Sequence, residues 1–193
     1  MQTYSELVST VGDYLDRDDL ASRIPTFIRL TESRLNRLLD DPDMEVVTTL
    51  AGDGVAQPED FGSIVSIGTG DGNPLRPMTN AEYASVRPVG GVPRYYTIQD
   101  GKLRYVPGSA IVTLVYRRSI PPLTEAAPSN WLLSRAPDLY LYGVLLQASA
   151  FLVEDDRIGL WKSAFDEAIG ELQMDGVRRK WGPGPVAARI RRP

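Results

Sequence analysis

Hydrophobic positions near the N-terminus recur every three or four residues, a period that predicts amphipathic helices. A first helix follows the capping-box spacing Thr3-x-x-Glu6. A short turn over 19–24 and a main helix over about 25–39 come next, because Pro25 suits a first helical turn and Pro42 disfavours helix at the residue before it. The positions expected to be buried are Leu7, Val8, Val11, Tyr14, Leu15, Phe27, Ile28, Leu35, Leu38 and Leu39. The other face of the main helix is expected to carry Arg29, Glu32, Arg34 and Arg37.

The same period returns in the last third of the chain. Residues 128–133 are predicted to be a connector, and Ser134 is a candidate cap for a helix that starts near Pro137 and runs to about Val153. A second helix is predicted from Arg157 to about Val177. The expected core positions of these two helices are Leu139, Tyr142, Leu145, Leu146, Phe151, Leu160, Trp161, Ala164, Phe165, Ala168, Ile169 and Leu172.

Short strands and turns are predicted between these helical regions. Residues 44–50, 64–67, 94–99, 102–106 and 111–118 are rich in β-branched and aromatic residues. Asp100-Gly101 is a two-residue turn whose chemistry matches the twist of a β-hairpin, so the last three strands are expected to form an antiparallel meander. Thr79-x-x-Glu82 predicts a short capped helix that ends at about Val86.

The predicted fold class is therefore α+β. Residues 1–40 and 134–177 are expected to form an antiparallel bundle of about four helices, and residues 41–133 an inserted, antiparallel β-rich region. Residues 178–193 are expected to form an extended basic C-terminal tail, since Pro and Gly are frequent there. A chain of 193 residues is long enough for one domain with such an insertion.

The absence of cysteine and histidine excludes much chemistry. A disulfide, a thiolate zinc site, a thiol nucleophile and a Ser–His–Asp relay are all ruled out, so an enzyme would have to use carboxylates, Ser, Tyr, Lys or Arg. No catalytic residue, cofactor or metal site is predicted. The sequence shows no signal peptide and no apolar stretch long enough to cross a membrane, so no membrane partner is expected.

Charge is distributed unevenly along the chain. The net charge is −4, yet no acidic residue follows Asp175, and six basic residues lie after Val177. Residues 1–177 therefore carry −10. The basic residues are 18 Arg and 3 Lys, which fits either a GC-rich genome or an interface protein that uses the planar guanidinium for paired hydrogen bonds. The tail is either a disordered terminus or a segment that folds on a partner.

Two kinds of residue groups resemble binding sites. Gly68-Thr69-Gly70-Asp71-Gly72 resembles a phosphate loop, but it leads into Pro74 and not into a helix, so a β-turn is expected. Acidic residues gather at 154–156 and at Asp40, Asp41 and Asp43, where solvated helix ends are expected in preference to cation sites.

Tyrosines on neighbouring predicted strands allow two interpretations. Tyr95 and Tyr96 with Tyr105 and Tyr116 can act as ordinary cross-strand pairs that stabilise a sheet. The alternative is a platform on which nucleic-acid bases stack, with arginines close by at Arg94, Arg104, Arg117 and Arg118. The negative net charge opposes that alternative.

An ordered series of short motifs resembles a known family. The N-terminal part contains Thr3-Tyr4-Ser5-Glu6-Leu7, Tyr14-Leu15-x-Arg17-x-Asp19-Leu20, Ile24-Pro25-x-Phe27-Ile28-x-Leu30 and Glu32-x-Arg34-Leu35-Asn36-Arg37. The later motifs are Pro74-Leu75-Arg76-Pro77, Pro93-Arg94-Tyr95-Tyr96, Tyr116-x-x-x-Ile120-Pro121-x-Leu123, Asn130-Trp131-Leu132-Leu133 and Pro137-Asp138-Leu139-Tyr140-Leu141-Tyr142-Gly143. Over most of residues 3–175 the chain resembles the head–tail adaptor, or connector, proteins of tailed phages.

The resemblance implies a structural virion protein of the neck and no enzymatic activity. It implies a ring, commonly of twelve copies, that assembles in the host cytoplasm between the portal ring and a tail or nozzle protein. Double-stranded DNA would pass through the channel without sequence-specific binding. The alternatives are a tail completion or terminator protein and a carboxylate-dependent hydrolase.

Two sets of contact residues follow from that role. The tail segment is expected to bind the portal through Arg178, Arg179, Lys180, Trp181, Arg189, Ile190, Arg191 and Arg192. Contacts between subunits or with the tail protein are expected from Arg29, Arg34, Arg37, Tyr95 and Tyr96.

Overall fold

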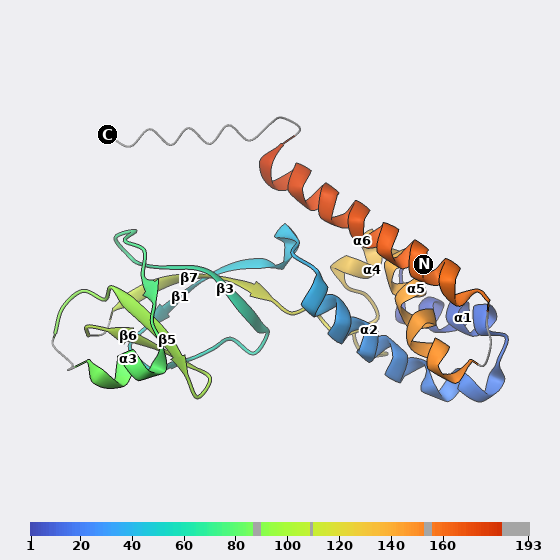
Figure 1. Ribbon diagram of the computed structural model, residues 1–193, viewed down its shortest axis with the longest axis horizontal. Helices are drawn as coiled ribbons and strands as arrows, with labels where there is room; N and C mark the ends of the chain where they lie inside the picture. The colour runs from blue at the N-terminus through green and yellow to red at the C-terminus, as the bar shows by residue number, and fades with distance from the viewer. Residues whose placement is uncertain (87–89, 109, 153–155, 183–193) are drawn as a thin grey trace. The chain divides into compact units, whose positions relative to one another are not determined.

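The computed structural model describes residues 1–86, 90–108, 110–152 and 156–182 (Figure 1). The chain is a mixed α and β protein that divides into two compact units. The helical unit comprises Met1–Asp43 and Ile120–Pro193, and the β unit comprises Met44–Ser119. The domain limits inferred from the sequence, at 40, 134 and 177, stay a prediction.

The helical unit begins as its sequence pattern predicts. Helix α1 (Tyr4–Leu15) is capped by Thr3, whose side chain accepts a hydrogen bond from the backbone N–H of Glu6. The Glu6 carboxylate accepts from the N–H of Gln2, one residue before the position that a full capping box uses. A 3₁₀ helix (Asp18–Arg23) leads into α2 (Ile24–Leu38), with Pro25 in the first turn.

Helix α5 (Pro137–Ala148) is the centre of this unit. It packs against α1, α2, α4 (Trp131–Arg135) and α6 (Ile158–Trp181). Figure 1 shows α2 and α6 beside it. Gly143 lets α2 and α6 come close to it, because a Cβ at this position would lie 2.5 Å from Cγ2 of Thr31 and 3.0 Å from Cε2 of Phe165. A central helix with neighbours on several sides explains why α5 is apolar nearly all round. The structure does not confirm a four-helix bundle.

Several predicted helix limits and core positions are wrong. The predicted connector forms helix α4, and Asn130 caps this helix because its side chain accepts a hydrogen bond from the N–H of Leu133. Ser134, the predicted cap, lies inside α4. Helix α5 ends at Ala148, where a 3₁₀ turn (Ser149–Phe151) follows. The side chains of Tyr14, Leu38, Phe151 and Leu160 are exposed, although the period of the sequence predicted them to be buried.

The predicted extended tail also begins too early. Residues 178–181 form the last turn of α6, since Arg and Lys favour helix and basic groups there interact well with the helix C-terminus. The helix ends at Trp181 and is followed by Gly182, whose φ of 74° suits glycine. The remainder of the predicted tail, 183–193, lies outside the described residues.

Two small sheets build the β unit. In the first sheet, β7 (Ile111–Arg118) lies between β1 (Glu45–Ala51) and β3 (Phe61–Thr69), antiparallel to both. The second has the order β2 (Val55–Ala56), β6 (Lys102–Val106), β5 (Tyr95–Gln99) and β4 (Arg76–Pro77), with β4 parallel to β5. Helix α3 (Asn80–Ser85) carries the complete capping box of Thr79 and Glu82 that the sequence predicted.

The hairpin prediction is confirmed, and the meander prediction is wrong. Strands β5 and β6 join at Asp100-Gly101, and both turn residues have positive φ, as a type I′ turn requires. Strand β7 does not pair with β6, because Pro107 lacks an N–H and Gly108, at φ 73°, directs the chain away from the second sheet. Both sheets contribute to one core, made of Ile67, Leu75, Leu103, Tyr105, Val112, Leu114 and Tyr116.

Candidate functional site

The basic end of α6 is the described part of the predicted portal-binding segment. Arg178, Lys180 and Trp181 are exposed in its last turn, and Lys180 Nζ lies 5.9 Å from the centre of the Trp181 ring. Arg179 instead binds acidic residues of the same unit. The other predicted residues, Arg189, Ile190, Arg191 and Arg192, lie outside the described residues.

Arg179 belongs to a group of five charged residues, here called the Asp41 cluster, which consists of Asp41, Asp43, Arg135, Asp175 and Arg179. Arg135 Nη1 donates to Asp41 Oδ1 and Oδ2 at 2.9 and 3.0 Å and to Asp43 Oδ2 at 3.0 Å, and its Nη2 donates to Asp175. Arg179 Nη2 donates to Asp41 Oδ1 at 2.9 Å, and its Nη1 donates to both oxygens of Asp43 at 3.1 Å. The cluster thus joins the end of α6 to α4 and to the corner after α2.

The local sequence explains why this corner is buried. The Asp41 carboxylate accepts from the N–H of Asp43, which fixes the turn around Pro42. Gly176 lets α6 approach, since a Cβ there would lie 3.0 Å from Asp41 Oδ2 and 3.2 Å from Pro42 Cδ. Asp41 is only 2% exposed, so the expectation of a solvated helix end at 40–43 is wrong for this residue. Burial lowers the pKa of Arg135, but hydrogen bonds to Asp41 and Asp175 outweigh it, and the net shift is upward.

A second network lies in the interior of the same unit and is centred on Glu32. The side chain is 5% exposed, so its predicted place on the polar face of α2 is wrong. Glu32 Oε1 accepts from the N–H of Leu123 at 2.8 Å and from the Tyr140 hydroxyl at 3.1 Å. Asn130 Nδ2 donates to that hydroxyl at 2.8 Å and to the Pro121 carbonyl at 2.7 Å. The network attaches the segment 121–123 to α2 and α5.

Helical spacing could have located Glu32. Residues 28, 32, 35 and 39 follow one another at intervals of four, three and four, and the other three members are buried apolar residues. Burial raises the pKa of Glu32, while the hydrogen bonds from Leu123 and Tyr140 lower it by less. A general acid needs a raised pKa together with access to substrate, and a buried Glu32 lacks the access.

The exposed face of α2 carries the predicted contact arginines. Arg29 donates to Thr26 Oγ1 at 3.3 Å, and Arg37 donates to Ser33 Oγ at 2.8 Å, so each bonds only to a hydroxyl of its own helix in the described structure. Both side chains are exposed. Arg34 differs because its guanidinium lies 4.6 Å from the centre of the Phe165 ring and is half-buried.

A shallow hollow of about 280 Å³ between α5 and α6 gathers acidic side chains. Asp138, Glu171 and Asp175 line it together with Arg135. Asp138 and Glu171 are exposed, while Asp175 is half-buried and bound by Arg135. Three carboxylates and one guanidinium leave the lining of this acidic hollow with an excess of negative charge.

The tyrosines of the β unit do not form one exposed platform. Tyr95 is exposed, and Tyr96 is half-buried opposite Tyr105. Tyr105 and Tyr116 are 3% and 4% exposed, so neither ring offers a face for stacking of a base. Burial, helped by the charge of Asp53, raises the pKa of Tyr105 to about 12.

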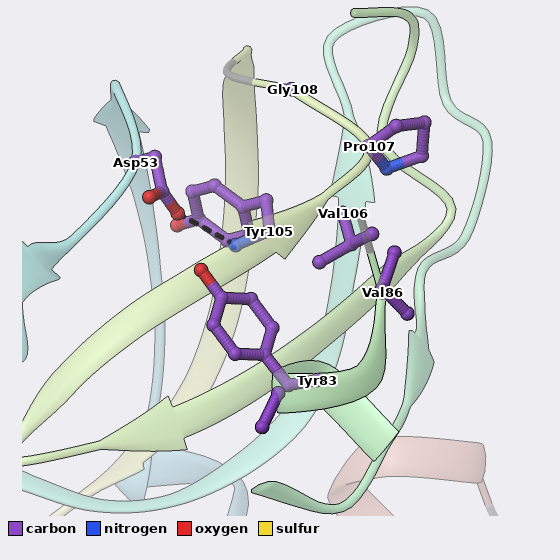
Figure 2. Close-up of a pocket in the computed structure, with 8 residues that line it drawn as sticks. Asp53, Tyr83, Val86, Tyr105, Val106, Pro107 and Gly108 are labelled. Atoms are coloured by element: carbon purple, nitrogen blue, oxygen red, sulfur yellow. Dashed lines mark hydrogen bonds between the residues drawn. The ribbon is translucent and has the colours of Figure 1, made fainter. Parts of the chain in front are cut away.

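A pocket of about 500 Å³ lies beside Tyr105 (Figure 2). Asp53 accepts from the N–H of Tyr105 at 2.8 Å and from Arg104 Nη1 at 3.2 Å. Figure 2 shows the Tyr83 ring pointing from α3 toward Tyr105, with Val86, Val106 and Pro107 along the apolar side. Among the described lining residues Asp53 is the one carboxylate, so this pocket does not supply the carboxylate pair that a glycoside hydrolase needs.

No group of His, Cys, Asp or Glu suited to hold a metal ion is found within residues 1–86, 90–108, 110–152 and 156–182. None of the helices described is long and apolar enough to cross a membrane.

The model of a protein family described as SU10 adaptor protein matches residues 2–189, nearly the whole chain. A search of curated proteins finds no match.

Proposed function

Because the chain belongs to the SU10 adaptor protein family, a family of phage head–tail adaptors, we propose that it forms a ring between the portal and the tail. Membership makes the protein a structural component of the virion at the head–tail region. The observation that carries the proposal is the extent of the family match, which includes both the helical and the β unit. The proposed ring has about twelve copies, each in contact with the next through unlike surfaces, as a closed ring requires.

The C-terminal segment is proposed to bind the portal ring. Exposed Arg178, Lys180 and Trp181 lie where the described chain ends, and three further arginines follow at 189–192. A positively charged, proline- and glycine-rich segment can order on an acidic groove, and such binding covers a large surface for its length.

The charge of the remaining chain supports a passive channel for DNA. Residues 1–177 carry −10. Each Lys or Arg contact with phosphate adds affinity, so an acidic lining would let the duplex slide without being held. A structure of the assembled ring with a strongly basic lining would contradict this part of the proposal.

The proposed role is tested by native mass spectrometry of the protein mixed with the portal ring encoded beside it. The expected product is one portal ring with about one adaptor per portal subunit. An intact portal ring without bound adaptor would overturn the proposal. Binding to tail proteins in that case would identify a tail completion protein.

The structure indicates which deletion tests the portal-binding segment without disturbing the helical unit. Removing 183–193 leaves the described contacts of the Asp41 cluster in place, whereas removing 178–193 also deletes Arg179. We expect the shorter deletion to abolish portal binding with an unchanged melting temperature. A matched variant in which Arg189, Arg191 and Arg192 become Gln should weaken binding without shortening the chain. Portal binding that survives both changes would contradict the anchor.

A further inference from the structure

The acidic hollow and the outer face of α2 have complementary chemistry. The hollow presents Asp138, Glu171 and Asp175 around a single guanidinium. The outer face of α2 presents Arg29 and Arg37 two turns apart, about 12 Å along the axis, and no acidic side chain lies between them on that face. Glu32, the acidic residue of α2, points into the core and is bonded there.

Asp175 is paired with Arg135 and Arg179, but the other charges of the two surfaces have no ion-pair partner within the described chain. Neither Arg29 nor Arg37 forms an ion pair with a described carboxylate, and each reaches only a hydroxyl one turn earlier on its own helix. Asp138 and Glu171 likewise form no ion pair within the described residues. An arginine fork can bind a carboxylate through two parallel hydrogen bonds, so a hollow with several carboxylates is well suited to a guanidinium.

Exposed apolar side chains accompany both charged surfaces. Leu30 is 48% exposed between Arg29 and Arg37, and Met174, three residues after Glu171, is 59% exposed. Arginine and methionine are enriched at protein interfaces, where an apolar core is surrounded by a polar rim. The outer face lies on α2 and the hollow lies between α5 and α6, so one copy carries both of the surfaces that a contact between copies needs.

We propose that the outer face of α2 in one copy binds the acidic hollow of the next copy, with Arg37 directed toward Glu171 and Asp138. This inference rests on the proposed ring and adds the two surfaces through which its copies meet. Because the surfaces differ, the contact is head-to-tail, and an open chain of copies has one unused surface at each of its two ends until the ring closes.

Charge reversal in the full-length protein, assembled on the portal ring, tests the contact. Arg37→Glu and Glu171→Arg should each raise the adaptor concentration needed for half-maximal ring formation by about tenfold or more, because like charges would then face each other across the contact. The double variant should recover most of the loss. Both residues are exposed and off the core, so each variant should fold, and circular dichroism verifies this. Lys102→Glu and Asp71→Arg, exposed in the β unit, are matched controls that should leave assembly unchanged.

Engineered disulfides give a second readout. The chain has no cysteine, so Arg37→Cys combined with Glu171→Cys introduces the only thiols. A head-to-tail contact should give a ladder of covalent multimers under oxidising conditions, and each single cysteine variant should not.

The possible results separate the inference from the function on which it rests. Rings that form equally well with Arg37→Glu and Glu171→Arg, and no disulfide ladder, would overturn the inference while the ring stands. A wild-type protein that does not assemble on the portal at all would overturn both.

Discussion

Glu32 and Asp41 are both acidic residues that the helical unit buries, but they differ in the partners that surround them. Glu32 receives hydrogen bonds from neutral donors, the N–H of Leu123 and the hydroxyl of Tyr140. Asp41 receives them from two arginines and from the N–H of Asp43. A buried carboxylate is costly unless it is hydrogen-bonded or paired with an opposite charge. The helical unit thus stabilises one buried carboxylate by hydrogen bonds from neutral groups and the other by ion pairs.

The difference also decides how each network responds to its surroundings. Protonation relieves the cost of burying Glu32, and its pKa is accordingly raised by burial. The Asp41 cluster instead pairs carboxylates with guanidinium groups, and its arginines reach the surface, with Arg135 20% and Arg179 39% exposed. The stability that the Glu32 network contributes should therefore depend on pH. The stability lost when Arg135 or Arg179 is replaced should depend on how exposed that arginine is.

The largest expected effect is that of Asp41→Ala. It leaves Arg135 and Arg179 without the buried carboxylate that both share, and it removes the bond to the N–H of Asp43. Loss of one partner from a buried ion pair costs about 3 kcal/mol or more. Urea denaturation should show this loss of unfolding free energy. Asp13→Asn, an exposed position on α1, should change it by less than about 0.5 kcal/mol.

Tyr140→Phe should have the next largest effect. It removes the hydroxyl that links Asn130 to Glu32 and leaves the Glu32 carboxyl with one of its two described donors. A buried group that loses a hydrogen bond costs about 1 to 2 kcal/mol. Tyr142→Phe, on the half-buried side of α5, is the matched control. Equal stability of Tyr140→Phe and wild type would mean that the network does not stabilise the fold.

The pH dependence of Glu32→Gln isolates the buried carboxyl. The pKa of Glu32 is raised in the folded state, so its contribution is present in full below the unfolded-state value of about 4 and is lost as the pH rises through the folded-state value. The unfolding free energy of wild type relative to Glu32→Gln should therefore rise as the pH falls from 7 to about 4. Denaturation curves of both proteins at each pH give this difference. A difference that does not change with pH would contradict the assignment.

The smallest expected effect is that of Arg179→Gln, compared with Arg135→Gln. The two arginines share Asp41 and Asp43 as partners, but Arg179 is about twice as exposed. Its loss should cost about 0.5 kcal/mol, as for a surface pair, and that of Arg135 clearly more. The two melting temperatures measure this order, and the reverse order would show that exposure does not control the strength of the cluster.

Local sequence signals predicted much of the fold. Caps at Thr3 and Thr79, the first-turn prolines Pro25 and Pro137, and the Asp100-Gly101 turn all lie where the sequence placed them. Each depends on a few neighbouring residues, so the chain alone carries the information. The pairing of β7 with β1 and β3 depends on distant strands, and the local sequence favoured the nearer partner, β6.

The same reasoning explains which site residues the sequence missed. Asp41, Arg135 and Asp175 lie far apart in the chain, and only the packing of α6 against the corner at Pro42 brings them together. The charge of Glu32 favours an exposed position, whereas its helical spacing with Ile28 and Leu35 matches the buried position that the structure shows. Arg29 and Arg37 were placed on an exposed face correctly, since a single helix determines that arrangement.

The Asp41 cluster also has a mechanical consequence. It fastens the last turns of α6 to the corner from which the chain enters β1. A force that pulls on the chain after Gly182 would act on Arg179, which lies within one helical turn. The hydrogen bonds from Arg179 to Asp41 and Asp43 would oppose this force together. The i to i−4 bonds of α6 on the N-terminal side of Arg179 would then bear little of that tension, so the helix would resist unravelling from its C-terminal end.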